Sequence, residues 1–296
     1  MPMQLSSNVV EQWVALAEGR FNVRDLWYDL GIETAENKSY LRVILSRLVE
    51  KGTITRLSNY GDFRVIDSTL TPINWQQADP NRTVPLLFPF GEHEYAKIFP
   101  KSIIIVAGTK NAGKTAYLYN FIALNMGRFP IDLFNSETSP EQMNERFKPL
   151  DIPNPAPFNV YERYDNFADV INPDRISVID YLDENSEAYL VGTEIDRIFR
   201  KLKSVAVIGL QKPPPTVTFV KGIKKIIDRD LAYGGGYTAK RAILYITMST
   251  NKLKLLYVKT PAQPKINPNN MQWSFSMNGD GIHFVDVKRS YGDDLL

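Results

Sequence analysis

The feature that most constrains this chain is an apolar, β-branched run that ends in a glycine-framed turn. Residues 103–107 read Ile-Ile-Ile-Val-Ala, and residues 108–115 read Gly-Thr-Lys-Asn-Ala-Gly-Lys-Thr. This order predicts a buried strand, then a loop whose backbone N–H groups surround phosphate oxygens, then a helix. The helix is indicated by apolar residues at helical spacing: Tyr117, Leu118, Phe121, Ile122 and Leu124. A chance glycine turn does not account for strand, loop and helix in this order.

Two residues of the predicted loop have expected individual roles. Lys114 supplies a positive charge to the β- and γ-phosphates of a nucleoside triphosphate, and the Thr115 hydroxyl is placed to bind Mg²⁺ at the start of the helix, where the helix dipole favours anions. The expected nucleotide-binding residues are Gly108, Thr109, Lys110, Asn111, Ala112, Gly113, Lys114 and Thr115. The predicted ligands are therefore ATP and Mg²⁺.

Composition excludes several other kinds of site. The chain of 296 residues is 44% hydrophobic and 23% charged, as in a globular protein with one large and one small domain. It has no cysteine and only two histidines, which argues against disulfides, thiolate catalysis, zinc sites and a catalytic triad. No apolar run approaches the length of a membrane span, and the N-terminus lacks a secretory pattern. We therefore expect a cytoplasmic protein with no membrane partner.

Residues 1–67 predict a small helical unit that ends in a β-hairpin. Apolar residues recur at helical spacing in three segments, and two strand-like segments flank the turn signal 58–62. We interpret this layout as a winged helix-turn-helix domain, with Lys38 and Arg42 near the exposed start of its third helix. The unit carries eight Lys or Arg and nine Asp or Glu, so both DNA and a protein remain open as its partner.

The rest of the chain predicts a linker and an α/β core. Residues 68–100 contain five prolines and no steady periodicity, which indicates a linker that lies across a neighbouring surface. Residues 101–296 then alternate strands and helices, which predicts a mostly parallel sheet with helices on both faces, and they end in an antiparallel hairpin. The expected core strands are 102–107, 131–135, 175–180, 205–210, 242–248 and 253–259.

Three further residues lie where strands are expected to end. Glu137 follows the second core strand, and a carboxylate there can orient the water that attacks the γ-phosphate. Asp180 ends an apolar strand and is the expected support of the metal ion. Gln211 ends the next strand, where an amide can sense the γ-phosphate. The alternatives for Glu137 are a solvated loop glutamate or a charge at a helix N-terminus, and the alternative for Gln211 is an exposed polar residue that leaves a strand.

These motifs together resemble the RecA superfamily of P-loop ATPases and, within it, the C-terminal domain of DnaB-like helicases. The resemblance covers roughly residues 86–260 and is carried by the phosphate loop, by Asn135–Met143 with Arg146, by Val178–Leu182 and by Ile195–Gln211. It implies a ring or filament of identical subunits, with ATP at each interface and DNA near the centre.

The resemblance also implies a basic finger that reaches into the neighbouring subunit's site. Lys259 stands where the family has the lysine of a Lys-x-Arg pair, but Pro261 replaces the arginine. The substitutes in this chain are Arg241 and Lys240. This departure favours a weaker contribution from the neighbouring subunit to hydrolysis.

Charge is concentrated in one part of the chain. Residues 196–259 hold 14 Lys or Arg against three Asp, whereas the whole chain has a net charge of only +2. A basic segment directly after Gln211 suits salt-dependent, sequence-independent binding of single-stranded DNA. The expected contacts are Lys212, Lys221, Lys224, Lys225 and Arg229. A solvated basic face or a subunit contact is the alternative.

The sequence therefore favours a DNA-associated ATPase that couples hydrolysis to nucleic-acid binding or translocation, as a helicase does in replication or recombination. Two alternatives remain open. One is a nucleotide-switched assembly, loader or mediator protein without unwinding activity. The other is a sequence-specific regulator that reads DNA with its winged helix and senses nucleotide with its core.

Overall fold

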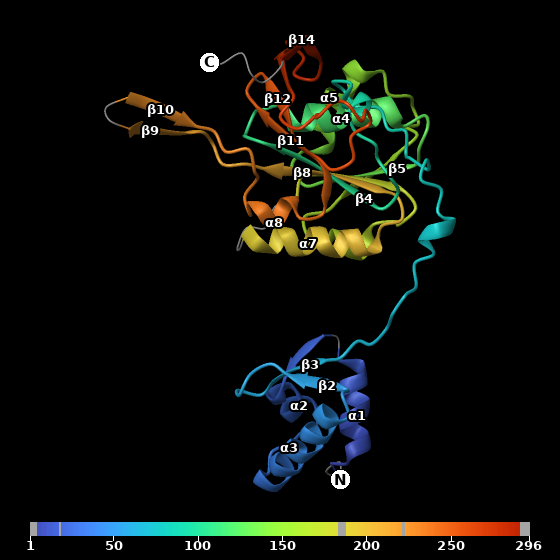
Figure 1. Cartoon of the computed structure of the whole chain (residues 1–296), viewed down its shortest axis with the longest axis vertical. Helices are drawn as coiled ribbons and strands as arrows, with labels where there is room; N and C mark the ends of the chain where they lie inside the picture. The colour runs from blue at the N-terminus through green and yellow to red at the C-terminus, as the bar shows by residue number, and fades with distance from the viewer. Residues whose placement is uncertain (1–4, 18, 183–187, 221–222, 291–296) are drawn as a thin grey trace. The chain divides into compact units, whose positions relative to one another are not determined.

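The computed structural model describes residues 5–17, 19–182, 188–220 and 223–290. The chain forms two compact units, Met1–Ala78 and Asp79–Leu296, which Figure 1 colours from blue to red along the sequence. Each unit has its own hydrophobic core. We describe the two units separately.

The first unit contains three helices and a three-stranded antiparallel sheet. Its elements are α1 (Ser7–Leu16), β1 (Arg20–Asn22), α2 (Val23–Asp29), α3 (Ala35–Glu50), β2 (Ile54–Arg56) and β3 (Asp62–Val65). The three helices and the β2–β3 hairpin agree with the sequence-based expectation. Strand β1 was not expected; it pairs with β3, and Phe21 stacks on Phe63 with ring centroids 5.7 Å apart. The winged-helix interpretation of this unit stays a prediction.

The segment predicted as a linker behaves as two different parts. Residues 67–83 are exposed and contain only the short 3₁₀ helix η1 (Trp75–Gln77). Residues 84–98, which include η2 (Glu92–Glu94), belong to the core of the second unit. The buried side chains of this segment are Leu86, Phe88, Phe90, Tyr95, Ala96 and Ile98. The linker prediction is therefore wrong for residues 84–98, which we call the N-terminal strap.

A nine-stranded sheet forms the centre of the second unit. Its order is β14-β13-β12-β11-β4-β8-β7-β5-β6. The strands β11, β4, β8, β7, β5 and β6 are parallel, and β12, β13 and β14 extend the sheet antiparallel. Their bounds are β4 (Ser102–Gly108), β5 (Ile131–Asn135), β6 (Asn159–Glu162), β7 (Ile176–Asp180), β8 (Val205–Gln211), β11 (Ala242–Ser249), β12 (Lys252–Val258), β13 (Gln272–Met277) and β14 (Phe284–Ser290). The six predicted core strands and the C-terminal hairpin are confirmed, whereas β6 was not predicted.

Helices cover both faces of this sheet, as Figure 1 shows. One face packs against α4 (Lys114–Asn125), α5 (Pro140–Phe147), η3 (Lys148–Leu150) and the N-terminal strap. The other packs against α6 (Phe167–Val170), α7 (Ala188–Lys201) and α8 (Gly236–Ala239). The predicted fold class, an α/β core with a mostly parallel sheet and helices on both faces, is therefore confirmed.

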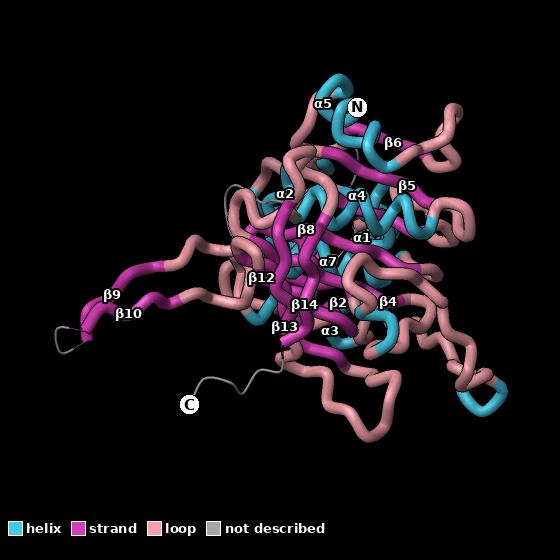
Figure 2. The backbone as a smooth tube through the Cα atoms, turned by 90° about the horizontal axis from the view of Figure 1, so that it is seen from above, coloured by secondary structure: helices cyan, strands magenta, loops and turns pink. Residues whose placement is uncertain are grey.

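One hairpin leaves the body of the second unit. Strands β9 (Thr216–Val220) and β10 (Ile223–Ile227) form a two-stranded antiparallel sheet that pairs with no other described strand. Figures 1 and 2 both show them extending away from the central sheet. This β9–β10 hairpin follows β8 directly, so its base lies at the sheet edge where β8 ends.

Candidate nucleotide site

The sheet order brings four strand ends together at one edge. Gly108 at the end of β4 pairs with Gln211 at the end of β8, and Asn135 at the end of β5 pairs with Asp180 at the end of β7. All four strands run parallel, so their carboxyl ends point the same way, which is where open α/β sheets bind ligands. The predicted residues of the nucleotide site therefore meet at a common edge.

The loop between β4 and α4 has the backbone that the sequence predicts. Gly113 has φ +90° and stands directly before α4, a conformation that favours glycine. Gly108 must also be glycine, because an added Cβ would lie 2.7 Å from Lys114 Cγ. The loop therefore presents the N-terminus of a twelve-residue helix to a ligand.

Lys114 is buried inside this arrangement. It is 8% exposed, and its Nζ donates a hydrogen bond of 3.0 Å to Gln211 Oε1. Burial lowers the pKa of Lys114, and the nearby carboxylates of Glu137 and Asp180 oppose that change. The structure thus places Lys114 within hydrogen-bonding distance of Gln211 and close enough to Glu137 and Asp180 to interact electrostatically with both.

Asp180 has the features of a metal-supporting carboxylate. It is fully buried, and Thr115 Oγ1 donates a hydrogen bond of 3.4 Å to its Oδ1. Its Oδ2 is buried without a hydrogen-bond partner among the described residues. Burial, followed by the charge of Glu137, raises the pKa of Asp180 to about 6. One carboxylate beside one hydroxyl fits Mg²⁺, which keeps several waters and takes other ligands from substrate phosphates.

Glu137 lies on an organised turn between β5 and α5. Asn135 holds this turn: its side-chain oxygen accepts hydrogen bonds from Thr138 N and Thr138 Oγ1, at 3.2 and 2.9 Å. Ser136 N and Oγ donate to the backbone oxygens of Asp180 and Tyr181, at 2.9 and 2.8 Å. The Glu137 side chain itself is exposed. The turn is therefore fixed to β7 while its carboxylate stays accessible.

Helix α5 begins as the sequence predicts. Ser139 caps it, Pro140 opens it, and Gln142 completes a capping box with Ser139. The charge of Arg146 on this helix opposes part of the rise in the pKa of Asp180. Asn135 and Arg146 were not predicted as site residues, although the polar run 135–139 was the signal for an ordered turn.

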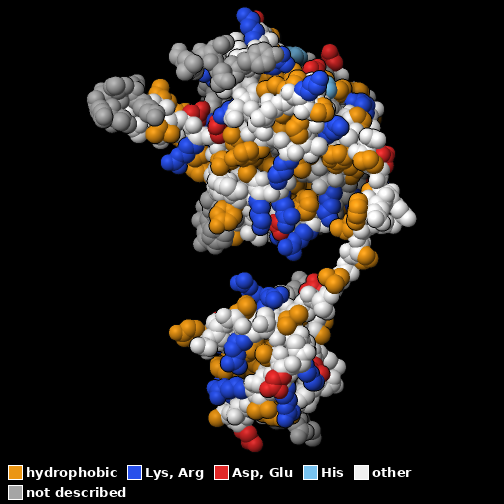
Figure 3. Space-filling model, in the orientation of Figure 1, with side chains coloured by type: hydrophobic (Ala, Val, Ile, Leu, Met, Phe, Trp, Pro, Cys, Tyr) orange, Lys and Arg blue, Asp and Glu red, His pale blue; other side chains and the backbone are white. Residues whose placement is uncertain are grey.

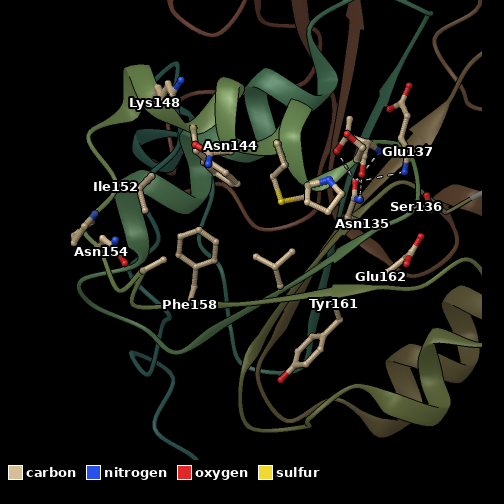
Figure 4. Close-up of a pocket in the computed structure, with 18 of the residues that line it drawn as sticks. Asn135, Ser136, Glu137, Asn144, Lys148, Ile152, Asn154, Phe158, Tyr161 and Glu162 are labelled. Atoms are coloured by element: carbon tan, nitrogen blue, oxygen red, sulfur yellow. Dashed lines mark hydrogen bonds between the residues drawn. The ribbon is translucent and has the colours of Figure 1, made fainter.

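A cavity of about 1100 Å³ lies beside the turn that carries Glu137. It is bounded by the turn, α5, η3 and the edge strand β6. Figure 4 shows Glu137, Ser136 and Asn135 at one end of this cavity and Ile152 and Asn154 at the other. The cavity therefore borders the turn that carries Glu137.

The prediction that Lys212 contacts nucleic acid is wrong. Lys212 is 1% exposed, and its Nζ lies 2.9 Å from Asp228 Oδ1 and 2.8 Å from Ser249 Oγ. A buried lysine with these partners joins the end of β8 to the base of the β9–β10 hairpin. Basic charge and position suggested a surface residue, whereas the partners Asp228 and Ser249 hold this lysine inside the fold.

The other basic candidates of this segment lie on or beside the hairpin. Arg229 is exposed just after β10. Lys221 lies outside the described residues, as do the side chains of Lys224 and Lys225. A further group of Lys and Arg side chains covers α7 at the lower edge of the second unit in Figure 3. The described basic residues of 196–259 are thus spread over several elements, including α7 (Arg197, Arg200 and Lys201) and β12 (Lys252 and Lys254).

The candidates for a finger in trans have partners within their own chain. Arg241 forms an ion pair with Asp196 and lies over the Phe199 ring, 4.6 Å from its centroid. Lys259 is exposed, and its Nζ donates a hydrogen bond of 3.3 Å to the Lys240 backbone oxygen. Lys259 is therefore the more accessible of the two.

The basic candidates of the first unit lie on α3. Lys38 Nζ lies over the Trp27 ring, 4.6 Å from its centroid, and Arg42 is exposed. Arg42 also lines a cavity of about 280 Å³ together with Arg56 and Tyr60 of the β2–β3 hairpin. The predicted recognition helix and the hairpin therefore share one small concave surface.

Within the described ranges, no helix has both the length and the apolar character needed to cross a bilayer. No protein-family model and no curated protein matches the chain.

Two solved structures align with most of this chain. The crystal structure of the RadB recombinase aligns with 66% of this chain and 93% of its own, at 12% identity and a TM-score of 0.42. A second solved structure, of an isolated ATPase domain, aligns with 72% of this chain and 95% of its own, at 12% identity and a TM-score of 0.48. At this identity, neither structure indicates what the chain binds or catalyses.

Proposed function

We propose that the second unit binds and hydrolyses ATP with Mg²⁺ and couples this cycle to gripping or translocating along DNA, as an oligomer of identical chains. The observation that supports this most directly is the meeting of Lys114, Asp180, Glu137 and Gln211 around one glycine-framed loop. These groups supply the cation, metal support, base and sensor that phosphoryl transfer needs.

The proposed reaction uses each of these side chains at a definite atom. The oxygen of a water bonds to the γ-phosphorus while the bond from that phosphorus to the bridging oxygen breaks, which yields ADP and phosphate. Glu137 accepts the proton of the water, and Lys114 neutralises charge on the phosphate oxygens. Thr115 and Asp180 would hold Mg²⁺, and the bound ion would neutralise charge on the same oxygens.

Coupling to DNA is proposed through the end of β8. Gln211 hydrogen-bonds to Lys114, and the next residue, Lys212, is ion-paired to Asp228 at the base of the β9–β10 hairpin. A change at the γ-phosphate could therefore reach the basic hairpin through the Lys114–Gln211 hydrogen bond, the peptide bond to Lys212 and the ion pair with Asp228. We propose single-stranded DNA as the ligand of this hairpin, and either DNA or a protein as the ligand of the first unit.

A nucleotide-dependent switch without unwinding activity is the second candidate function. It is favoured by the lack of a strong candidate for a basic finger that reaches the neighbouring subunit's site. Pro261 replaces the expected arginine, and Arg241 forms an ion pair with Asp196 of its own chain. Unwinding of forked DNA with ATP would support a motor. ATP-dependent DNA binding without unwinding would support the switch.

The ATPase proposal is tested with two variants and one control. We expect Lys114→Ala to reduce ATP turnover at least about 100-fold, and Glu137→Gln to do the same while ATP still binds. Glu145→Gln removes an exposed carboxylate of α5 and should retain turnover. Steady-state phosphate release and thermal melting measure activity and folding. Undiminished turnover in both site variants would refute the proposed site.

A further inference from the structure

A cavity of about 610 Å³ lies at the base of the β9–β10 hairpin. Its walls include Pro213, which precedes β9, then Arg229 and Tyr233, which follow β10, and Leu256 and Tyr257 of β12. Tyr233 is 48% exposed and Tyr257 is 43% exposed. The cavity therefore offers two accessible aromatic side chains, and its volume is within the range of ligand pockets.

The charge presented by this cavity comes mainly from arginine. Two acidic residues lie beside it, but Asp228 is ion-paired to buried Lys212 and Asp230 to Lys254, at 2.9 and 2.8 Å. Arg229 stands between them in sequence, is exposed, and forms no ion pair within the described part of the chain. The acids are neutralised locally, so the net field at the cavity favours an anionic ligand.

Hydrogen bonds fix the backbone beside the aromatic walls. Ala232 N donates to the hydroxyl of Tyr245 at 2.9 Å, and the ring of Tyr245 meets Tyr257 edge to face, with centroids 6.0 Å apart. Tyr233 N donates to the backbone oxygen of Gln211 at 3.0 Å. The Tyr257 ring and the backbone of Tyr233 are therefore ordered before a ligand binds, which reduces the entropic cost of binding.

We propose that this cavity binds an unpaired base of single-stranded DNA, stacked on Tyr233 or Tyr257, while the phosphates beside it contact Arg229. This inference rests on the proposed DNA-binding function and assigns to it a base-binding site. Aromatic faces beside a cation are the usual means of holding single strands, and stacking accepts any base because every base has a π-face. The Tyr233–Gln211 bond connects the site to the residue that contacts Lys114.

The test compares an oligonucleotide with bases and one without. Fluorescence anisotropy with the full chain, Mg²⁺ and a nonhydrolysable ATP analogue gives the affinities for oligo(dT) and for an abasic strand of the same length. We expect Tyr233→Ala and Tyr257→Ala to weaken oligo(dT) binding about five- to 100-fold each, with little change for the abasic strand. The corresponding Tyr→Phe variants should bind both strands as the wild type does.

The control is Tyr237→Ala, an exposed tyrosine nearby that does not line this cavity; it should leave both affinities unchanged. Equal losses on the two strands, or none on either, would overturn the base-binding site while leaving DNA binding intact. If the wild-type chain bound neither strand, the proposed DNA-binding function would be refuted together with the site.

Discussion

Buried charged groups surround the first half of α4. Lys114 and Asp180 lie on the nucleotide side, and Glu92 of the N-terminal strap lies in the hydrophobic core beside the same helix. Glu92 accepts hydrogen bonds from the Tyr117 hydroxyl at 2.8 Å and from Phe90 N at 2.9 Å. A fully buried carboxyl group with two neutral donors makes the stability of this unit depend on pH.

The first prediction concerns Glu92. Burial raises the pKa of Glu92 from 4.5 to about 7. Because the folded pKa is above the unfolded one, the stabilising contribution is complete below about pH 4.5 and is lost as the pH rises through about 7. At 1.36 kcal/mol per pH unit this loss is about 3 kcal/mol at most. We expect Glu92→Gln to remove most of it.

Urea unfolding at pH 5 and pH 8 measures this effect. The wild type should lose more unfolding free energy between the two pH values than Glu92→Gln does. Glu94→Gln, which changes an exposed carboxyl group two residues away, should behave like the wild type. Parallel losses in the wild type and Glu92→Gln would show that the buried carboxyl group does not titrate in this range.

Among the elements, the N-terminal strap shows where the sequence misled. Five prolines and the lack of periodicity in residues 68–100 indicated a linker, but Phe88, Phe90 and Tyr95 pack into the core of the second unit. Irregular backbone has no period, so its burial cannot be recognised from spacing; its aromatic content was the available signal. The boundary of the second unit therefore precedes the first core strand by more than twenty residues.

The second prediction follows from this boundary. A fragment of residues 79–296 should fold cooperatively, whereas a fragment of residues 101–296 should not. The shorter fragment lacks six buried apolar side chains. Burying each of the larger ones stabilises the fold by about 1.5–3 kcal/mol, and their combined contribution exceeds the unfolding free energy of many domains. Circular dichroism melting of both fragments measures this. A cooperative, unchanged transition in residues 101–296 would contradict the role assigned to the strap.

The regular strands were predicted well because their signals are local. A buried parallel strand is a continuous apolar run, as in 103–107 and 205–210, and its end is marked by the first polar residue. Strand β6 was missed because it is four exposed residues at the edge of the sheet. The β9–β10 hairpin was missed because three prolines precede it and charged residues interrupt its alternation.

For the whole molecule, the sequence predicted which residues of the proposed nucleotide site come together better than it predicted which basic residues are exposed. Short sequence motifs identify four residues of this site, and the order of the strands brings them together: Lys114, Thr115, Asp180 and Gln211. Surface contacts depend on which way a side chain points, so the burial of Lys212, just after β8, was not predicted. Tyr233 and Tyr257 are separated by 24 positions and carry no motif, and only the fold places them around one cavity.

The two functions proposed for this molecule meet at Gln211. Its side chain contacts Lys114 in the nucleotide site, and its backbone oxygen accepts a hydrogen bond from Tyr233 at the proposed base-binding cavity. The central claim is therefore that a triphosphate occupies the loop 108–115 with Glu137 facing its terminal phosphate.

A crystal structure with Mg²⁺ and a nonhydrolysable ATP analogue tests this claim most directly. We expect the phosphates inside the loop 108–115, the metal ion beside Thr115 and Asp180, and the Glu137 carboxylate directed at the γ-phosphate. A nucleotide bound elsewhere, or a Glu137 carboxylate directed away from a phosphate in the loop, would contradict it.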